Sequence, residues 1–248
     1  MKRVGLLVGV GAVIVVALGA WVFFSGGSGE PSTGVTAPPI SAVPTTATAS
    51  TETPADTAVP ETAAAPETAN VIIFEIDQSG STASFTLDEE LSGSPQTVVG
   101  VTNELAGQIQ VDFSEPTNSL VGEIVINART LETDSTFRNR AIRGQILNSA
   151  SDEFEFITFV PTTTDGLPGD ATAPFSFTVT GDLTIRTVTQ SVTFTVEITE
   201  ASETSLVGTA TAEVLRSDFD LNIPSVPRVA NVTDEVRLDL SFTAVPTG

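Results

Sequence analysis

The sequence predicts an all-β fold, a single antiparallel domain of about eight to ten strands with one short helical segment, behind an apolar amino terminus and a polar linker. From Val71 onward, apolar and polar residues alternate in short runs, which is typical of strands that bury one face. About ten such runs follow one another, separated by turn-forming Gly, Pro, Asn and Ser. An open sheet of this size would leave exposed edges, so the pattern favours a closed barrel or a two-sheet sandwich.

Residues 1–24 form the first of three predicted segments. Lys2 and Arg3 precede Val4–Phe24, a run of 21 residues without a charge. At about 1.5 Å per residue this run crosses a hydrocarbon core of about 30 Å, and the basic pair predicts a cytoplasmic amino terminus. We therefore expect a single-pass anchor in the cell membrane with the rest of the chain extracytoplasmic. The alternative is a signal peptide cleaved near Ala17-Leu-Gly19, which would leave a secreted or periplasmic protein.

The apolar run also contains Gly5 and Gly9, four residues apart. Small residues at this spacing let two membrane helices approach closely and would support a homodimer. Glycine is common in membrane spans, however, so a lone pair of this kind is more often without such a role. We keep the homodimer as an open alternative to a monomeric anchor.

Residues 25–70 are the second predicted segment, a disordered linker. They contain no Lys, Arg or aromatic residue, and Thr, Ala and Pro dominate. Because the segment lacks apolar periodicity, it cannot bury enough surface to offset the entropy of ordering. As a coil it would span roughly 35 to 40 Å. We therefore expect a tether that contributes nothing to the folded core of residues 71–248, the third segment.

The composition excludes several classes of function. The chain has no Cys, His or Tyr, so it has no thiol catalyst, no thiolate or imidazole metal site and no histidine base. The formal net charge is −21, which repels nucleic acid. No phosphate loop or nucleophile motif occurs. We therefore expect neither a catalytic residue, nor a metal site, nor a cofactor beyond a bound lipid, and no nucleic-acid partner.

The predicted strands fall into two groups by the regularity of their alternation. The regular ones are Gln108–Phe113, Phe175–Ile185, Val192–Ile198, Leu206–Val214 and Val236–Phe242. The less regular ones are Val71–Asp77, Thr82–Glu89, Thr97–Asn103, Leu120–Ala128 and Phe154–Val160. Because each regular strand has one apolar face, these faces together predict a common interior.

Only residues 133–148 interrupt the β pattern. Asp134 or Ser135 is suited to cap a helix, and apolar or small residues follow at helical spacing. We expect one or two helical turns at the mouth of a barrel. Three of its residues are candidates for contact with a ligand there: Phe137, Arg138 and Arg143.

Four segments carry a family resemblance. They are Gly107–Asp112, Ala128–Arg138, Gly181–Thr189 and Arg216–Phe219. In order and spacing they resemble the YceI-like polyisoprenoid-binding family. The resemblance implies a lipocalin-like β-barrel over residues 71–248 that binds a long-chain isoprenoid lipid, either a polyisoprenoid or an isoprenoid quinone, in an apolar lumen without catalysis.

The resemblance and the strand pattern together give a set of lumen candidates. They are Ile109, Val111, Ile126, Phe177, Val179, Leu183, Ile185, Phe194 and Val196. A barrel of about eight strands either fills its interior with side chains or leaves one ligand cavity. A fully packed structural or interaction module of the cell envelope therefore remains the alternative. At the mouth, Arg138 and Arg143 would bind a quinone carbonyl or a diphosphate, or form ion pairs with Asp134 and Glu132.

Overall fold

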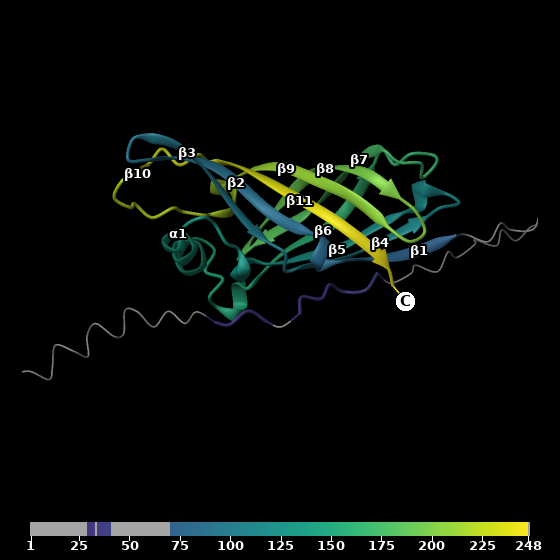
Figure 1. Cartoon of the computed structure of the whole chain (residues 1–248), viewed down its shortest axis with the longest axis horizontal. Helices are drawn as coiled ribbons and strands as arrows, with labels where there is room; N and C mark the ends of the chain where they lie inside the picture. The colour runs from purple at the N-terminus through teal and green to yellow at the C-terminus, as the bar shows by residue number, and fades with distance from the viewer. Residues whose placement is uncertain (1–28, 33, 41–69, 248) are drawn as a thin grey trace, which may run out of the picture.

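The computed structural model describes residues 29–32, 34–40 and 70–247 (Figure 1). The predicted anchor and residues 41–69 of the predicted linker lie outside the described residues. No helix among the described residues is long and apolar enough to cross a membrane. Residues 70–247 contain the predicted all-β domain with its one short helix.

The described residues form eleven strands. They are β1 Val71–Ile76, β2 Thr82–Leu91, β3 Ser94–Thr102, β4 Leu105–Asp112, β5 Leu120–Asn127, β6 Phe156–Asp165, β7 Phe175–Ile185, β8 Val188–Ala201, β9 Leu206–Leu215, β10 Val229–Ala230 and β11 Glu235–Pro246. Short 3-10 turns lie at Gln78–Gly80, Pro116–Asn118, Ala128–Thr130, Asp152–Phe154 and Arg216–Phe219.

Eight of these strands close into an antiparallel barrel. Around the ring the order is β1, β4, β5, β6, β7, β8, β9 and β11, and β11 pairs back with β1. Strands β2 and β3 form a hairpin that extends the wall, because β2 also pairs with β11. The closed ring removes the exposed edges that an open sheet would have. The structure thus decides for a barrel over a sandwich.

The two ends of the barrel differ in the length of their connections. At one end lie residues 128–155, the turn 186–187 and residues 216–234; we call this the α1 end. At the other end, called the opposite end, residues 113–119, 166–174 and 202–205 join the strands. Figure 1 shows α1 and β10 at the same extremity of the elongated barrel. The two longest connections, 128–155 and 216–234, therefore both lie at the α1 end.

The single helical segment begins where the sequence predicts. Helix α1 spans Thr136–Ala141 and continues into a π-helical turn over Ile142–Ile146. Of the two predicted caps, Ser135 is the one used, since its side chain accepts a hydrogen bond from the Arg138 backbone N–H. An N-cap of this kind satisfies one of the free amide donors of the first turn.

Residues 29–40 differ from the expectation for the linker. They lie along the outer face of the barrel, where Val35 is buried against Ala106 of β4 and Val125 of β5. The Ile40 backbone N–H also donates to the Gln108 side chain at 2.9 Å. These contacts depart from the expectation that the linker contributes nothing to the folded core, and the apolar one comes from the few apolar side chains among Thr and Pro. We call the described residues 29–32 and 34–40 the strap.

Candidate functional site

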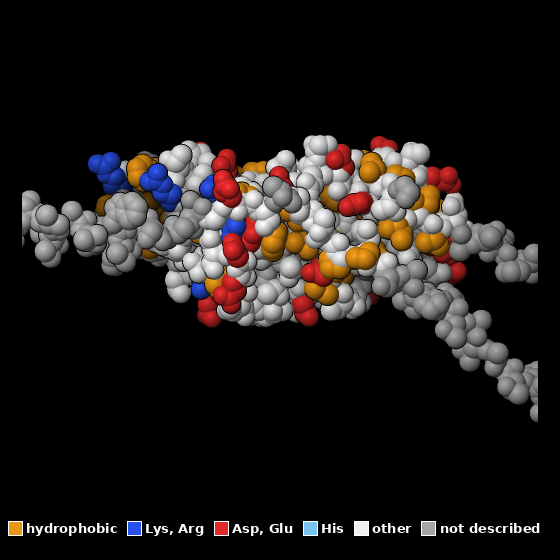
Figure 2. All heavy atoms as spheres, turned by 90° about the horizontal axis from the view of Figure 1, so that it is seen from below, with side chains coloured by type: hydrophobic (Ala, Val, Ile, Leu, Met, Phe, Trp, Pro, Cys, Tyr) orange, Lys and Arg blue, Asp and Glu red, His pale blue; other side chains and the backbone are white. Residues whose placement is uncertain are grey.

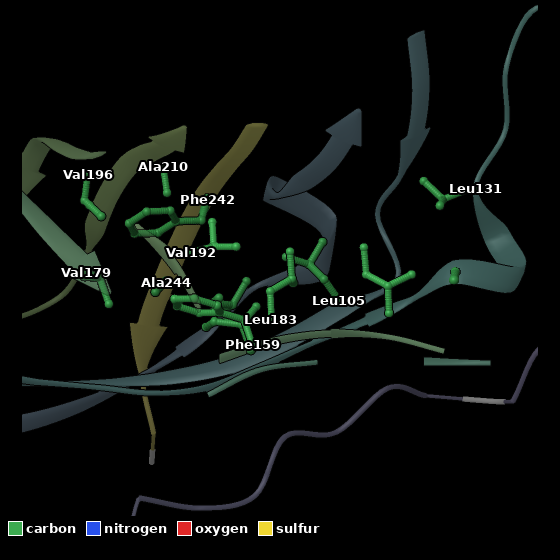
Figure 3. Packing of buried hydrophobic residues seen from close by; sticks show 14 of the residues in the cluster. Leu105, Leu131, Phe159, Val179, Leu183, Val192, Val196, Ala210, Phe242 and Ala244 are labelled. Carbon is green, nitrogen blue, oxygen red and sulfur yellow. The ribbon is translucent and has the colours of Figure 1, made fainter. Parts of the chain in front are cut away.

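The barrel encloses an apolar cavity of about 260 Å³. Its lining comes from all eight strands of the ring, from β2 and β3, and from the connections of the α1 end. Figure 3 shows side chains of the surrounding core, including Val179, Val196 and Phe242. Since apolar side chains make up most of the lining, the cavity favours an apolar occupant over a polar one.

Seven of the nine lumen candidates line this cavity. They are Ile109, Ile126, Val179, Leu183, Ile185, Phe194 and Val196. The other two, Val111 and Phe177, line a separate cavity of about 50 Å³ near the opposite end. The alternation identifies the inward face correctly for all nine, but it carries no information on height along the barrel axis. Whether the seven contact a lipid stays a prediction.

Close packing around the cavity depends on one glycine of the family motifs. A Cβ atom added to Gly181 would lie 2.6 Å from the Phe159 ring and 2.5 Å from the Val160 carbonyl oxygen. The ring of Phe159 therefore lies over Gly181, where no other residue fits. Phe159 in turn meets Phe194 edge to face, with centroids 5.0 Å apart. This pair forms part of the cavity wall.

An ion pair lies in the cavity lining at the α1 end. Arg138 donates to Glu89 of β2 at 2.8 Å, and the Glu89 side chain is only 7% exposed. Arg138 also pairs with Asp134, one turn earlier. A buried carboxylate needs such a partner, because an unpaired buried charge is costly. These two residues therefore place a paired charge in a cavity lined mostly by apolar side chains.

The three mouth candidates occupy different positions. Arg138 lines the cavity. Arg143 lies outside the lining and forms an ion pair with Glu132 at 3.3 Å, the structural alternative foreseen for it. Phe137 points away from the barrel and is 80% exposed. Of the three, only Arg138 could touch a ligand inside the cavity without a change in structure.

The sequence reading missed two parts of the lining. Glu89 follows Ala83, Phe85 and Leu87 on the inward face of β2, so an acid on an apolar face was the available signal. The loop after β9 contributes Leu221, Ile223 and Val232. Their apolar character in a loop that also carries charged residues was the signal there.

Arg216 fixes the ends of the loop that covers this part of the cavity. Its guanidinium donates to the carbonyl oxygens of Leu221 and Thr233, each at 3.1 Å. It also lies 3.6 Å from the Asp234 carboxylate. Hydrogen bonds from this one side chain therefore join two parts of the loop and hold its apolar residues over the cavity.

Comparisons with known proteins agree with this geometry. A family model described as the YceI-like domain matches residues 74–244. No curated protein matches the sequence. Burkholderia cenocepacia BcnA is 18% identical, covering 68% of this chain and 99% of its own, with a TM-score of 0.54. A polyisoprenoid binding domain from Saccharophagus degradans, implicated in plant cell wall breakdown, is 14% identical, with coverages of 71% and 99% and a TM-score of 0.53. These two structures show a shared fold.

Among the described residues, no group of three or more acidic, His or Cys side chains is placed to hold a metal ion.

Proposed function

Because the chain belongs to the YceI-like family, we propose that it binds or carries a long-chain isoprenoid lipid, a polyisoprenoid or an isoprenoid quinone, inside the barrel and without catalysis. The single observation that supports the proposal is the apolar cavity of about 260 Å³. Burying an isoprenoid chain there would recover about 25 cal/mol for each Å² removed from water. The solved polyisoprenoid binding domain with the same fold points to the same class of ligand.

The cavity volume bears on how much of the lipid would be enclosed. Ligand pockets commonly measure about 300 to 1,000 Å³, so 260 Å³ lies just below that range. A long chain would therefore enter only in part unless lining side chains change rotamer. The Arg138 and Glu89 pair would then face the polar head group, because both of its members line the cavity at the α1 end.

The location forms part of the proposal. We propose that the barrel works outside the cytoplasm, attached to the cell membrane by Val4–Phe24. The uninterrupted apolar run behind two basic residues supports this arrangement. Carbonate washing of membranes should leave the protein in the pellet, and protease added to intact cells should cut it. A soluble mature chain beginning near Ala20 would contradict the anchor.

The lipid itself is tested by extraction and mass spectrometry of the purified full-length protein. Val179 lies in the cavity wall and is 2% exposed. Val179→Phe should occupy the cavity and lower the amount of lipid recovered, whereas overpacking a filled core would cost about 1 to 3 kcal/mol. Thr178→Phe adds a ring to the neighbouring outward position and is the matched control. Strong destabilisation by Val179→Phe, with no lipid in the parent protein, would instead support a packed structural module.

A further inference from the structure

The strap begins at the α1 end of the barrel. There the carbonyl oxygen of Glu30 accepts a hydrogen bond from Arg129 at 2.7 Å. Ser32 donates from both its backbone N–H and its hydroxyl to the Glu155 carboxylate, at 2.6 and 2.8 Å. Arg129 and Glu155 are each about 3% exposed, and they lie 3.3 Å apart. The strap thus supplies two of the donors that satisfy a buried carboxylate.

From this point the strap runs toward the opposite end across β4 and β5 (Figure 1). The Val35 carbonyl oxygen accepts a hydrogen bond from Gln78 at 3.2 Å. Farther along, a Cβ atom on Gly122 would lie 2.8 Å from Ile40, so glycine leaves room for the chain at that point. Hydrogen bonds, the apolar contact of Val35 and the space left by Gly122 therefore fix the position of the strap along the barrel wall.

The length of chain before the strap limits where a membrane could lie. The apolar run ends at Phe24, and the first residue that the structure describes is Gly29. Five Cα to Cα steps reach at most about 16 to 18 Å. A free coil of residues 25–70 would instead allow roughly 35 to 40 Å in any direction. With the strap docked, the α1 end must stay close to the membrane surface.

We infer that the α1 end of the barrel faces the lipid bilayer, held there by the strap, and that the surface around Phe137 docks on it. The inference rests on the membrane anchor of the proposed function. It deepens that function, because the end of the cavity lined by Arg138 then lies next to the bilayer from which a lipid would enter. Residues 41–69 are in this arrangement a connection from the strap to β1 and not the tether.

The chemistry of the two ends supports this orientation. Phe137 is exposed at the α1 end, and Arg140 lies 6.0 Å from its ring centroid. An aromatic ring beside a cation suits the boundary between lipid head groups and hydrocarbon. Figure 2 shows blue basic side chains gathered toward one end of the molecule. The three connections of the α1 end carry seven Arg against eight acidic residues, whereas those of the opposite end carry three acids and no Arg.

The chain offers a matched pair of sites to test the orientation. It has no Cys, so a single introduced thiol can be labelled specifically. Gly144 at the α1 end and Gly169 at the opposite end both have open space where a Cβ atom would be. The longest strand has 14 residues, so the two ends lie on the order of 35 Å apart along a tilted barrel.

The experiment places full-length Gly144→Cys and Gly169→Cys, each with a fluorescent label, in phosphatidylcholine vesicles containing a spin-labelled head-group lipid. We expect several-fold stronger quenching of the label at position 144 than at position 169. Adding Val35→Asp, which puts a charge into the strap contact, should reduce the difference while the barrel still melts cooperatively.

Two results would overturn the orientation. If the protein floats with the vesicles but both labels are quenched equally, the strap does not orient the barrel, and the anchor and lipid binding stand. If the Val35→Asp variant keeps the full difference, the strap is not the cause. A protein that does not float with the vesicles would refute the anchor itself and the orientation with it, while lipid extraction would still test the cavity separately.

Discussion

The two ends of the barrel share one strand pattern but differ in how their interiors are filled. At the opposite end, Phe74 is fully buried and meets Phe113 edge to face at 6.3 Å, and the remaining cavity measures about 50 Å³. Toward the α1 end, inward Ile, Val and Leu residues lie beside Phe rings such as Phe159 and Phe194, and the cavity measures about 260 Å³. The difference teaches that alternation and inward-facing Phe residues, which both ends share, do not decide which part of a barrel can accept a ligand.

The largest effect should come from removing a ring at the packed end. Phe74→Ala should cost about 3 to 5 kcal/mol, because a fully buried Phe leaves a large void. Phe194→Ala is the matched change beside the existing cavity, where the ring already has empty space on one side. We expect a clearly smaller loss there. Urea denaturation of both variants measures the difference, and equal losses would show that the two ends are packed alike.

Acid should weaken the α1 end through Glu155. Burial raises the pKa of this carboxyl group, but hydrogen bonds from Ser32 and Asn127 and the charge of Arg129 together hold the pKa below its ordinary value of 4.5. Because the folded pKa is the lower one, the stabilisation is present above the unfolded pKa and is lost as pH falls through the folded pKa. Hydrogen bonds to a charged group contribute about 1.5 to 3 kcal/mol.

The measurement compares unfolding of the parent protein and of Glu155→Gln between about pH 7 and about pH 3. The variant should be less stable at neutral pH and should show a weaker dependence on pH. Protease cleavage within the strap should increase for the parent protein at acid pH. An identical pH dependence of the two proteins would show that other carboxyl groups account for it.

The sequence predicts which residues face the interior of the barrel better than it predicts where along the axis the cavity lies. Alternation places Val179 and Phe194 on the inward face, and the predicted cap Ser135 begins α1. The same alternation cannot tell that Val111 and Phe177 lie at the packed end, because period 2 fixes a face and not a height. The position along the axis depends on strand register, which is set by pairing between strands far apart in the sequence.

The strap could not be predicted for a different physical reason. A segment of Thr, Ala and Pro has too little apolar surface to order itself. Its order comes from a complementary surface on the barrel, namely the outward-facing Val125 of β5 and the buried Glu155. Two neighbouring residues, Ile124 and Val125, are both buried, so β5 departs from strict alternation. This break in the alternation is the feature of the sequence that reflects contact between β5 and the strap.

The smallest effect should come from trimming the strap contact itself. Val35→Ala removes two methyl groups from a buried site, which corresponds to at most about 1.6 kcal/mol at about 0.8 kcal/mol for each buried carbon. The loss in global stability is smaller still if the strap detaches before the barrel unfolds, because the barrel then no longer feels the substitution. Phe74 cannot detach in this way, because its ring is fully buried in the barrel. Val99→Ala, at an exposed site on β3, is the matched control and should stay within about 0.5 kcal/mol of the parent protein.

Protease sensitivity of the strap, compared with the urea midpoint of the barrel, separates local detachment from global unfolding. A strap that is cut equally fast in the parent and in Val35→Ala would show that residues 29–40 are not docked in solution, and the expectation of a free linker would then hold after all.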